Sequence, residues 1–112
     1  MSLSILILTL NEERNLTDCL QSVKWSDDIV VLDSFSSDRT VKIAEEMGAR
    51  VVQRRFDNWS AHQNWALEHV SFKHSWVFYL DADERMTEDL KDELLAIADD
   101  ARRAPIAYYC GR

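Results

Sequence analysis

Residues 76–83 read Trp-Val-Phe-Tyr-Leu-Asp-Ala-Asp, five apolar or aromatic residues followed directly by two carboxylates one residue apart. A short apolar run without polar alternation is typical of a strand buried on both faces, as in a parallel sheet covered by helices. The sequence therefore predicts a strand from Trp76 to Leu80, with Asp81 and Asp83 at its carboxyl end.

Three other segments share this character and alternate with helical patterns. The predicted strands are Ser4–Leu8, Ile29–Leu32, Arg50–Gln53 and Trp76–Leu80, of which Arg50–Gln53 has the weakest pattern. Apolar residues three and four apart predict helices over Leu16 to Val23, Val41 to Met47, Trp59 to Val70 and Leu90 to Ala101. This alternation is typical of an α/β fold with a mostly parallel sheet flanked by helices.

The end of the chain adds two expectations. Thr87 should cap the last helix, with Glu88 and Asp89 in its first turn. The segment from Ile106 to Arg112 should open a further strand. A chain that stops there looks shortened.

Composition limits the classes of protein and ligand. With 112 residues, 46% of them hydrophobic, the chain is long enough for one domain, and we treat residues 1–112 as a single unit. A net charge of -7 argues against a nucleic-acid polymer as partner, because phosphate backbones are bound by clustered Lys and Arg. A small anionic ligand would need a divalent cation, helix N-termini or a few basic residues beside it.

Neither cysteine chemistry nor membrane insertion is indicated. Cys19 and Cys110 share no metal-ligand spacing, so we expect reduced thiols and neither a zinc site nor a disulfide. The run from Leu3 to Leu10 is too short to span a bilayer and lacks a preceding basic region. We interpret it as a buried strand.

Polar side chains follow the ends of all four strands. In open parallel α/β sheets, ligands bind beyond the carboxyl ends of the strands. Taken strand by strand, the residues there are Thr9, Asn11 and Glu12; Asp33, Ser34, Ser36, Ser37 and Asp38; Arg54 and Arg55; and Asp81, Asp83 and Glu84. This edge of the sheet is the candidate site.

The pair Asp81 and Asp83 suits a hard divalent cation shared with phosphate oxygens of a substrate. Such an ion would neutralise a diphosphate and stabilise the charge on a departing phosphate. The alternative is that residues 81–84 form a solvated turn before the helix capped by Thr87. Taken alone, the motif favours neither interpretation.

Asp33 and the serine-rich segment after it also allow two interpretations. A carboxylate at a strand end can bind the hydroxyls of a ribose or the N–H of a base, but Asp-Ser clusters also make turns and cap helices. We expect Ser37 or Asp38 to cap the helix that starts near Thr40, and Asp33 to be the better ligand candidate.

The third predicted helix is unusually polar. It carries Trp59, His62, Gln63, Asn64 and Trp65. Without regard to position, the simpler interpretation is that the tryptophans pack inward and the amides are exposed. His62 has no His or Cys partner at metal spacing and is not predicted to be a metal ligand. The two arginines after the third strand either meet a diphosphate or lie on the surface.

Four segments together resemble family 2 glycosyltransferases. In chain order they are ILILTLNEE at 5–13, IVVLDSFSSDRT at 29–40, QNWAL at 63–67 and FYLDADER at 78–85. The resemblance covers nearly the whole chain, and its four motifs in the same order make it specific. Within the family, the chain most resembles bacterial enzymes that add sugars, often heptose or glucose, to the lipopolysaccharide core.

This resemblance implies a GT-A fold, a Rossmann-like sheet that binds a nucleotide diphosphate sugar together with Mg or Mn. By analogy, Thr9, Asn11 and Glu12 would line the nucleotide pocket, Asp33 would contact the base or ribose, Gln63 and Asn64 would approach the diphosphate, Asp81 would contact the ribose and sugar, and Asp83 would hold the metal.

The chain departs from the family pattern in two respects. Many relatives have glycine where Phe35 and Arg39 stand, so the loop after the second strand is expected to close differently over the nucleotide. Relatives also continue with segments that bind the acceptor and supply the catalytic base of an inverting enzyme. That base is absent from this chain unless Asp81 or Glu84 replaces it.

The sequence thus predicts metal-dependent, inverting transfer of a hexosyl or heptosyl group to a saccharide or lipid-linked acceptor in cell-envelope polysaccharide synthesis. A cytoplasmic protein, peripheral to the inner face of the membrane, would fit that role. The alternative is a non-catalytic nucleotide-sugar-binding or interaction module that forms a homo-oligomer through an open sheet edge. A phosphorylated receiver fits poorly, because no acidic pair follows the first strand.

Overall fold

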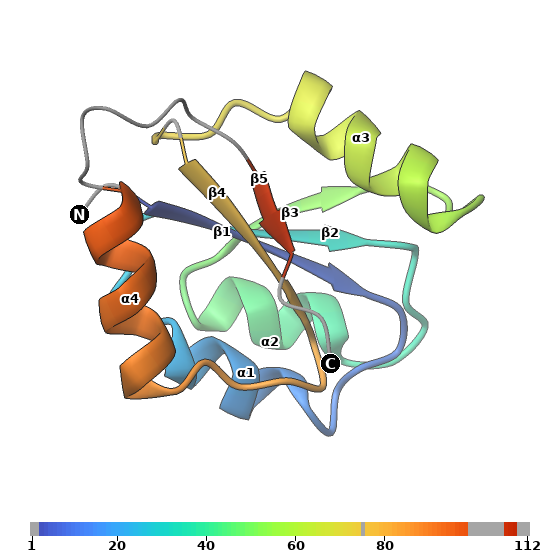
Figure 1. Cartoon of the computed structure of the whole chain (residues 1–112). Helices are drawn as coiled ribbons and strands as arrows, with labels where there is room; N and C mark the ends of the chain where they lie inside the picture. Colours follow the sequence, from blue (N-terminus) through green and yellow to red (C-terminus); the bar gives the residue numbers. More distant parts are fainter. Residues whose placement is uncertain (1–2, 75, 99–106, 110–112) are drawn as a thin grey trace.

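The computed structural model describes residues 3–74, 76–98 and 107–109, and it has the predicted α/β architecture (Figure 1). A five-stranded parallel sheet in this part of the chain has the order β3-β2-β1-β4-β5. The strands are β1 Leu3–Thr9, β2 Ile29–Asp33, β3 Arg50–Gln53, β4 Trp76–Asp81 and β5 Ala107–Tyr109. The four predicted strands and the start of a further one are confirmed.

Four helices connect these strands, and all were predicted. They are α1 Leu16–Ser22, α2 Thr40–Glu46, α3 Trp59–His69 and α4 Glu88–Ala98. The Thr87 cap is confirmed, since its Oγ1 accepts the Leu90 N–H at 3.2 Å. Before α2 the N-cap position is Arg39, and Asp38, one residue earlier, accepts the Thr40 N–H at 2.9 Å.

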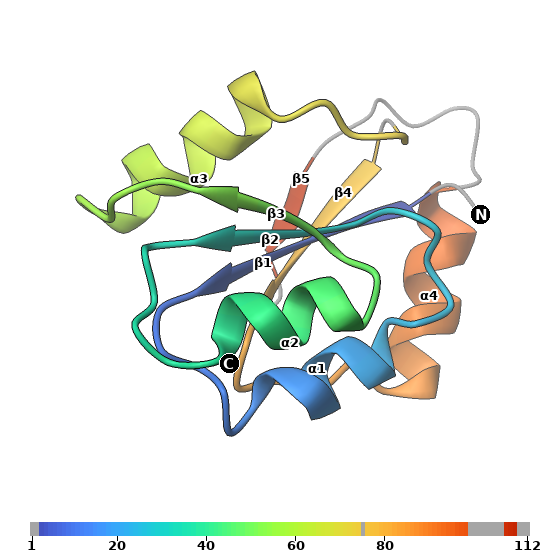
Figure 2. The same ribbon diagram turned by 180° about the vertical axis from the view of Figure 1, so that it is seen from behind.

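Each face of the sheet is covered by helices, because successive residues of a strand point to opposite faces. Helices α1, α2 and α4 lie on one face and α3 lies on the other (Figures 1 and 2). The first face buries Leu3, Ile5, Ile7, Val31, Phe78 and Leu80, and the second buries Leu6, Leu8, Val30, Leu32, Val77 and Tyr79. This double burial explains the continuous apolar runs in the sequence.

The weak pattern of β3 also has a structural reason. This strand is at the edge of the sheet, and Arg50 and Gln53 at its ends are exposed. The middle residues Val51 and Val52 are half-buried, one against each core. In the described part of the chain, no helix is long and apolar enough to cross a membrane.

The amino ends of the strands meet in a closed polar network around Asp28. This carboxylate is 5% exposed and accepts hydrogen bonds from Ser4 Oγ at 2.7 Å, the Lys73 N–H at 2.8 Å and Arg50 Nη2 at 2.9 Å. Burial opposes ionisation of Asp28, but these hydrogen bonds outweigh it and lower its pKa. The network ties β1, the start of β3 and the segment before β4 together.

The strand register determines which side chains meet at the carboxyl edge. Thr9 of β1 pairs with Asp33 of β2, and Leu8 pairs with Asp81 of β4. Because all strands are parallel, the segments that follow them emerge at this same edge. The end of β1 therefore lies between the two carboxylates that the sequence analysis singled out.

Candidate nucleotide-sugar site

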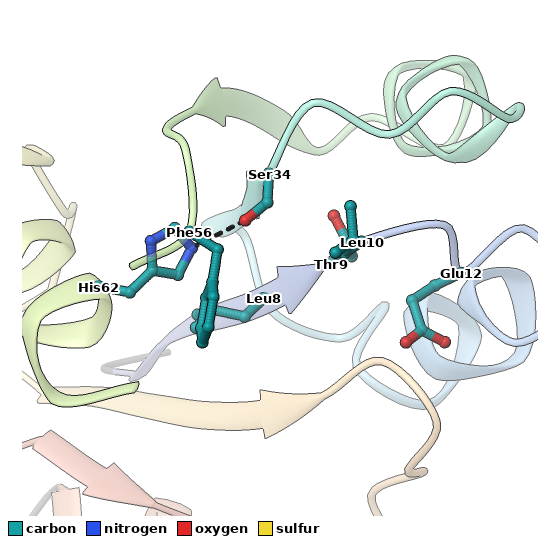
Figure 3. Close-up of a pocket in the computed structure, with 7 residues that line it drawn as sticks. All are labelled: Leu8, Thr9, Leu10, Glu12, Ser34, Phe56 and His62. Atoms are coloured by element: carbon teal, nitrogen blue, oxygen red, sulfur yellow. Dashed lines mark hydrogen bonds between the residues drawn. The ribbon is translucent and has the colours of Figure 1, made fainter. Parts of the chain in front are cut away.

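A pocket of about 220 Å³ opens beyond the ends of β1 and β2, beside the start of α3 (Figure 3). It is lined by Leu8, Thr9, Leu10, Glu12, Ser34, Phe56 and His62. In the close-up, Ser34, Phe56 and His62 lie on one side and Glu12 on the other, with Thr9 and Leu10 between them. Pockets for whole drug-sized ligands reach roughly 300 to 1,000 Å³, so this volume suits part of a nucleotide sugar.

Thr9, which lines this pocket, is hydrogen-bonded to Asp33. The Thr9 hydroxyl donates to Asp33 Oδ1 at 2.7 Å, because the two residues are paired in register and point to the same face. Asp33 is 0% exposed and also accepts the Ser36 N–H and hydroxyl and the Gln53 amide. In this structure its carboxylate holds the loop after β2, and contact with a base or ribose stays a prediction.

Asn11 joins the loop after β1 to the loop after β2. Its Oδ1 accepts the Ser37 N–H at 2.8 Å, and its own N–H donates to Ser36 Oγ at 2.8 Å. Glu12 continues the contact, since its N–H donates to Thr40 Oγ1 at 2.9 Å while its carboxylate is at the pocket. The two loops therefore form one unit around the ends of the strands.

Phe35 is an unusual residue within this unit. Its φ is +59°, in the left-handed region that favours glycine, and its side chain is 55% exposed. Among the described residues, the other non-glycine position with positive φ is Asn11. The loop thus keeps a glycine-type backbone at the position where the resemblance led us to expect a glycine.

Asp81, Asp83 and Glu84 gather at the carboxyl end of β4. Each offers a carboxylate oxygen, and these oxygens all lie within 4.8 Å of one another. Asp81 is buried and accepts the Tyr79 hydroxyl at 2.6 Å, whereas Asp83 is exposed and Glu84 is half-buried. The turn is held by the Glu84 N–H, which donates to the Asp81 carbonyl at 2.9 Å.

Cys19 on α1 lies in the negative electrostatic field of these three carboxylates, which affects the pKa of its thiol. Its Sγ lies 3.6 Å from the Asp81 carbonyl oxygen. Burial, and then repulsion from the carboxylates of Glu84, Asp83 and Asp81, raises the pKa of the thiol to about 12. The same negative field attracts a cation. Cys110 lies outside the described residues.

The burial of His62 at the pocket was not predicted from the sequence. His62 is 1% exposed, with Nε2 3.3 Å from Ser34 Oγ and Nδ1 3.0 Å from Arg54 Nη1. Phe56 packs against the imidazole edge to face, at 5.4 Å between ring centroids. A signal was available, because Ser34 and Arg54 directly follow paired strands and must be neighbours.

Arg54 is positioned by two further contacts. Its guanidinium makes a bidentate pair with Asp57 at 2.9 and 3.0 Å, and it stacks over the Trp65 ring. This pair lowers the pKa of Asp57. The guanidinium is half-buried among these protein groups, and its contact with a diphosphate stays a prediction.

The remaining predicted ligands lie on α3. Gln63 is half-buried and Asn64 is exposed, and their approach to a diphosphate stays a prediction. Thr9 and Glu12 line the pocket, and Asn11 and Asp33 hold the loops beside it. Asp81 and Asp83 lie at the carboxyl end of the neighbouring strand β4. The carboxyl edge thus brings the pocket and the carboxylate cluster to either side of the end of β1.

Comparison with known proteins places this geometry in a family. The model of "Glycosyl transferase family 2" matches residues 4–108. An uncharacterized glycosyltransferase of Rickettsia bellii is 36% identical over 93 residues, which is 82% of this chain and 31% of the relative. The lipopolysaccharide core biosynthesis glycosyltransferase LpsC of Rhizobium meliloti is 32% identical over 108 residues, 89% of this chain and 39% of LpsC.

Solved structures share the fold. Residues 1–349 of TarS from S. aureus superpose with a TM-score of 0.73 at 24% identity, over 91% of this chain and 33% of that one. Glucosyl-3-phosphoglycerate synthase from Mycobacterium tuberculosis, in complex with UDP, gives 0.69 at 23% identity, over 89% of this chain and 41% of that one. The chain spans about a third of the length of such proteins. It belongs to glycosyl transferase family 2 and has the GT-A fold.

Proposed function

We propose that this chain forms the donor-binding part of a glycosyltransferase that takes a sugar from a nucleotide diphosphate sugar. The observation that carries the proposal is the pairing of a partly apolar pocket with a carboxylate cluster across the end of one strand. The pocket suits the nucleoside, and the cluster suits an ion that binds the diphosphate. A protein with net charge -7 needs such an ion to hold an anionic donor.

The donor set of the cluster fits Mg²⁺ or Mn²⁺. Both ions prefer oxygen ligands, and a site with two or three carboxylates leaves positions for phosphate oxygens. Asp83, the exposed member, would be the main ligand, with Asp81 and Glu84 beside it. When bound, the ion supplies stabilisation of the negative charge that grows on the departing diphosphate.

The residues of the chain would contribute binding and orientation. Thr9, Asn11, Glu12 and Asp33 shape the nucleoside side, and Gln63, Asn64 and Asp81 extend toward the diphosphate and sugar. Inversion at the anomeric carbon would require a base near the acceptor hydroxyl. Glu84 and Asp81 are the candidates for that role within this chain.

The relatives support a finer proposal for the acceptor. LpsC is named for lipopolysaccharide core biosynthesis, so a saccharide or lipid-linked acceptor of the cell envelope is the first class to test. A hexosyl or heptosyl donor and a cytoplasmic site at the inner face of the membrane would go with that acceptor.

The deciding experiment is calorimetric titration of the chain with UDP, GDP and ADP sugars, with and without Mn²⁺. We expect one nucleotide to bind only when the ion is present. A folded chain that binds none of them in either condition would contradict the proposal. Donor binding without transfer to any envelope acceptor would instead favour the non-catalytic module.

A further inference from the structure

Buried His62 lines the pocket and contacts half-buried Arg54, and the function proposed above gives this pair no role. Arg54 Nη1 lies 3.0 Å from His62 Nδ1. Ser34 Oγ lies 3.3 Å from His62 Nε2, the contact drawn as a dashed line in Figure 3. A guanidinium has only N–H donors, so Nδ1 must be the acceptor in the first contact. In a neutral imidazole the proton is then on Nε2.

The second contact follows from the first. With its proton on Nε2, His62 donates to Ser34 Oγ, and the serine oxygen is an acceptor there. The hydroxyl hydrogen of Ser34 must then point elsewhere. Ser34 is half-buried and lines the pocket, so this hydrogen is available to a ligand.

The surroundings hold the imidazole in this state. Asp57 pairs with Arg54 through both carboxylate oxygens and orients the guanidinium. Phe56 covers the ring, and His62 is 1% exposed. Burial, and then the charge of Arg54, lower the pKa of His62, whereas Asp57 opposes that shift. A protonated ring would also turn an Nδ1–H toward the Arg54 cation.

We propose that Arg54 and His62 are positioning residues that fix the Ser34 hydroxyl as a hydrogen-bond donor to an acceptor oxygen on the nucleoside part of the donor. The inference rests on the proposed function. It adds a determinant of specificity. The pocket then binds more tightly a nucleoside that places a base carbonyl or a ribose hydroxyl opposite the Ser34 hydroxyl.

The first test concerns the free chain. Heteronuclear NMR of the His62 ring nitrogens at about pH 7.5 should give a neutral imidazole with Nε2 protonated. A ring protonated on Nδ1, or on both nitrogens, would overturn the inference whether or not a nucleotide binds.

The second test is binding of UDP, GDP and ADP with Mn²⁺ to Ser34→Ala, with Ser71→Ala at the opposite edge of the sheet as the matched control. We expect Ser34→Ala to weaken binding roughly five- to tenfold, the loss of one hydrogen bond, and the control to match wild type. If wild type binds and Ser34→Ala binds equally well, the inference fails and the proposed function stands. If wild type binds none, both fail.

The third test asks whether His62 affects binding through the Ser34 hydroxyl or only by stabilising the fold. His62→Leu should weaken binding about as much as Ser34→Ala, and the double variant should be no worse than either, because both act through one hydroxyl. Additive losses would contradict the inference. His62→Gln, whose amide can accept from Arg54 and donate to Ser34, should restore binding and guards against a misfolded His62→Leu.

The source of the acceptor oxygen follows from the same cycle with 2′-deoxy nucleotides. If Ser34 contacts the ribose 2′-hydroxyl, Ser34→Ala should not weaken binding of the deoxy form. If Ser34 contacts the 3′-hydroxyl or a base carbonyl, the roughly five- to tenfold penalty should persist.

Discussion

The two ends of the parallel sheet use polar groups in opposite ways. At the amino edge, Asp28 receives three hydrogen bonds from other segments of the chain and ends in a closed network. At the carboxyl edge, Asp83 is exposed in a cluster of three carboxylates, and Ser34 faces a pocket. The amino edge thus uses its polar groups to stabilise the fold, whereas the carboxyl edge presents polar groups at the surface and at a pocket, where we propose that the ligand binds.

Of the changes predicted here, Asp83→Ala should have the largest effect. It should weaken donor binding and leave the stability of the fold nearly unchanged. Substitution of a residue that only supports a metal ligand typically lowers metal affinity about 10- to 100-fold. If Asp83 is the ligand proposed above, its loss should weaken Mn²⁺-dependent donor binding at least about 100-fold. The free energy of unfolding should barely change, because Asp83 is exposed. Calorimetry and urea unfolding measure the two.

Asp92→Ala is the matched control, since Asp92 is an exposed carboxylate on α4 and the change in net charge is the same. Equal losses of binding in both variants would mean that overall charge, and not the cluster, holds the ion.

Asp28→Asn should show the opposite behaviour. The amide turns one acceptor into a donor facing the Lys73 N–H or Arg50, so the free energy of unfolding should fall by about 2 kcal/mol. Donor binding by the folded fraction should stay as in wild type. Urea unfolding tests the first part, and a large loss of affinity in folded protein would break the comparison.

Acid should weaken the carboxyl edge before the amino edge. The pKa of His62 is lowered, so the unfolded chain takes up a proton below about pH 6.5 that the folded chain resists, and stability falls there. The pKa of Asp28 is also lowered, so its contribution is complete above about pH 3.9 and is lost as pH falls through its folded value.

Urea unfolding of wild type, His62→Gln and Asp28→Asn between neutral pH and strong acid measures the order in which the two stabilising contributions are lost. The stability of wild type should fall relative to His62→Gln first, and the gap between wild type and Asp28→Asn should close only in stronger acid. The reverse order would contradict the assignment of the two groups.

The smallest effect concerns the strained loop of the carboxyl edge. At a φ of +59°, Phe35→Gly should be more stable than Phe35→Ala by about 1 kcal/mol, because alanine keeps the clash of Cβ with the backbone. Comparing the two variants removes the contribution of the exposed ring. Thermal unfolding of both measures it, and equal stability would argue against strain at this residue.

Much of the molecule could be predicted from local sequence. The run from Trp76 to Leu80 indicated a doubly buried strand, and Thr87 indicated the start of α4. These features depend on residues close together in the chain, so periodicity and capping are enough. The rule that ligands bind beyond parallel strands then pointed to Asp81 and Asp83. The family resemblance added the fold name and the donor.

Only the tertiary structure decided how distant side chains share their hydrogen bonds. From the sequence, Asp33 was a ligand candidate. In the structure, the strand register places its carboxylate where it accepts hydrogen bonds from Thr9 and from the loop after β2. The sequence left His62 without a partner, and the fold supplied Ser34, 28 residues away, and Arg54. Donors and acceptors in a sequence are visible as a set, but their pairing depends on strand order and on how α3 packs.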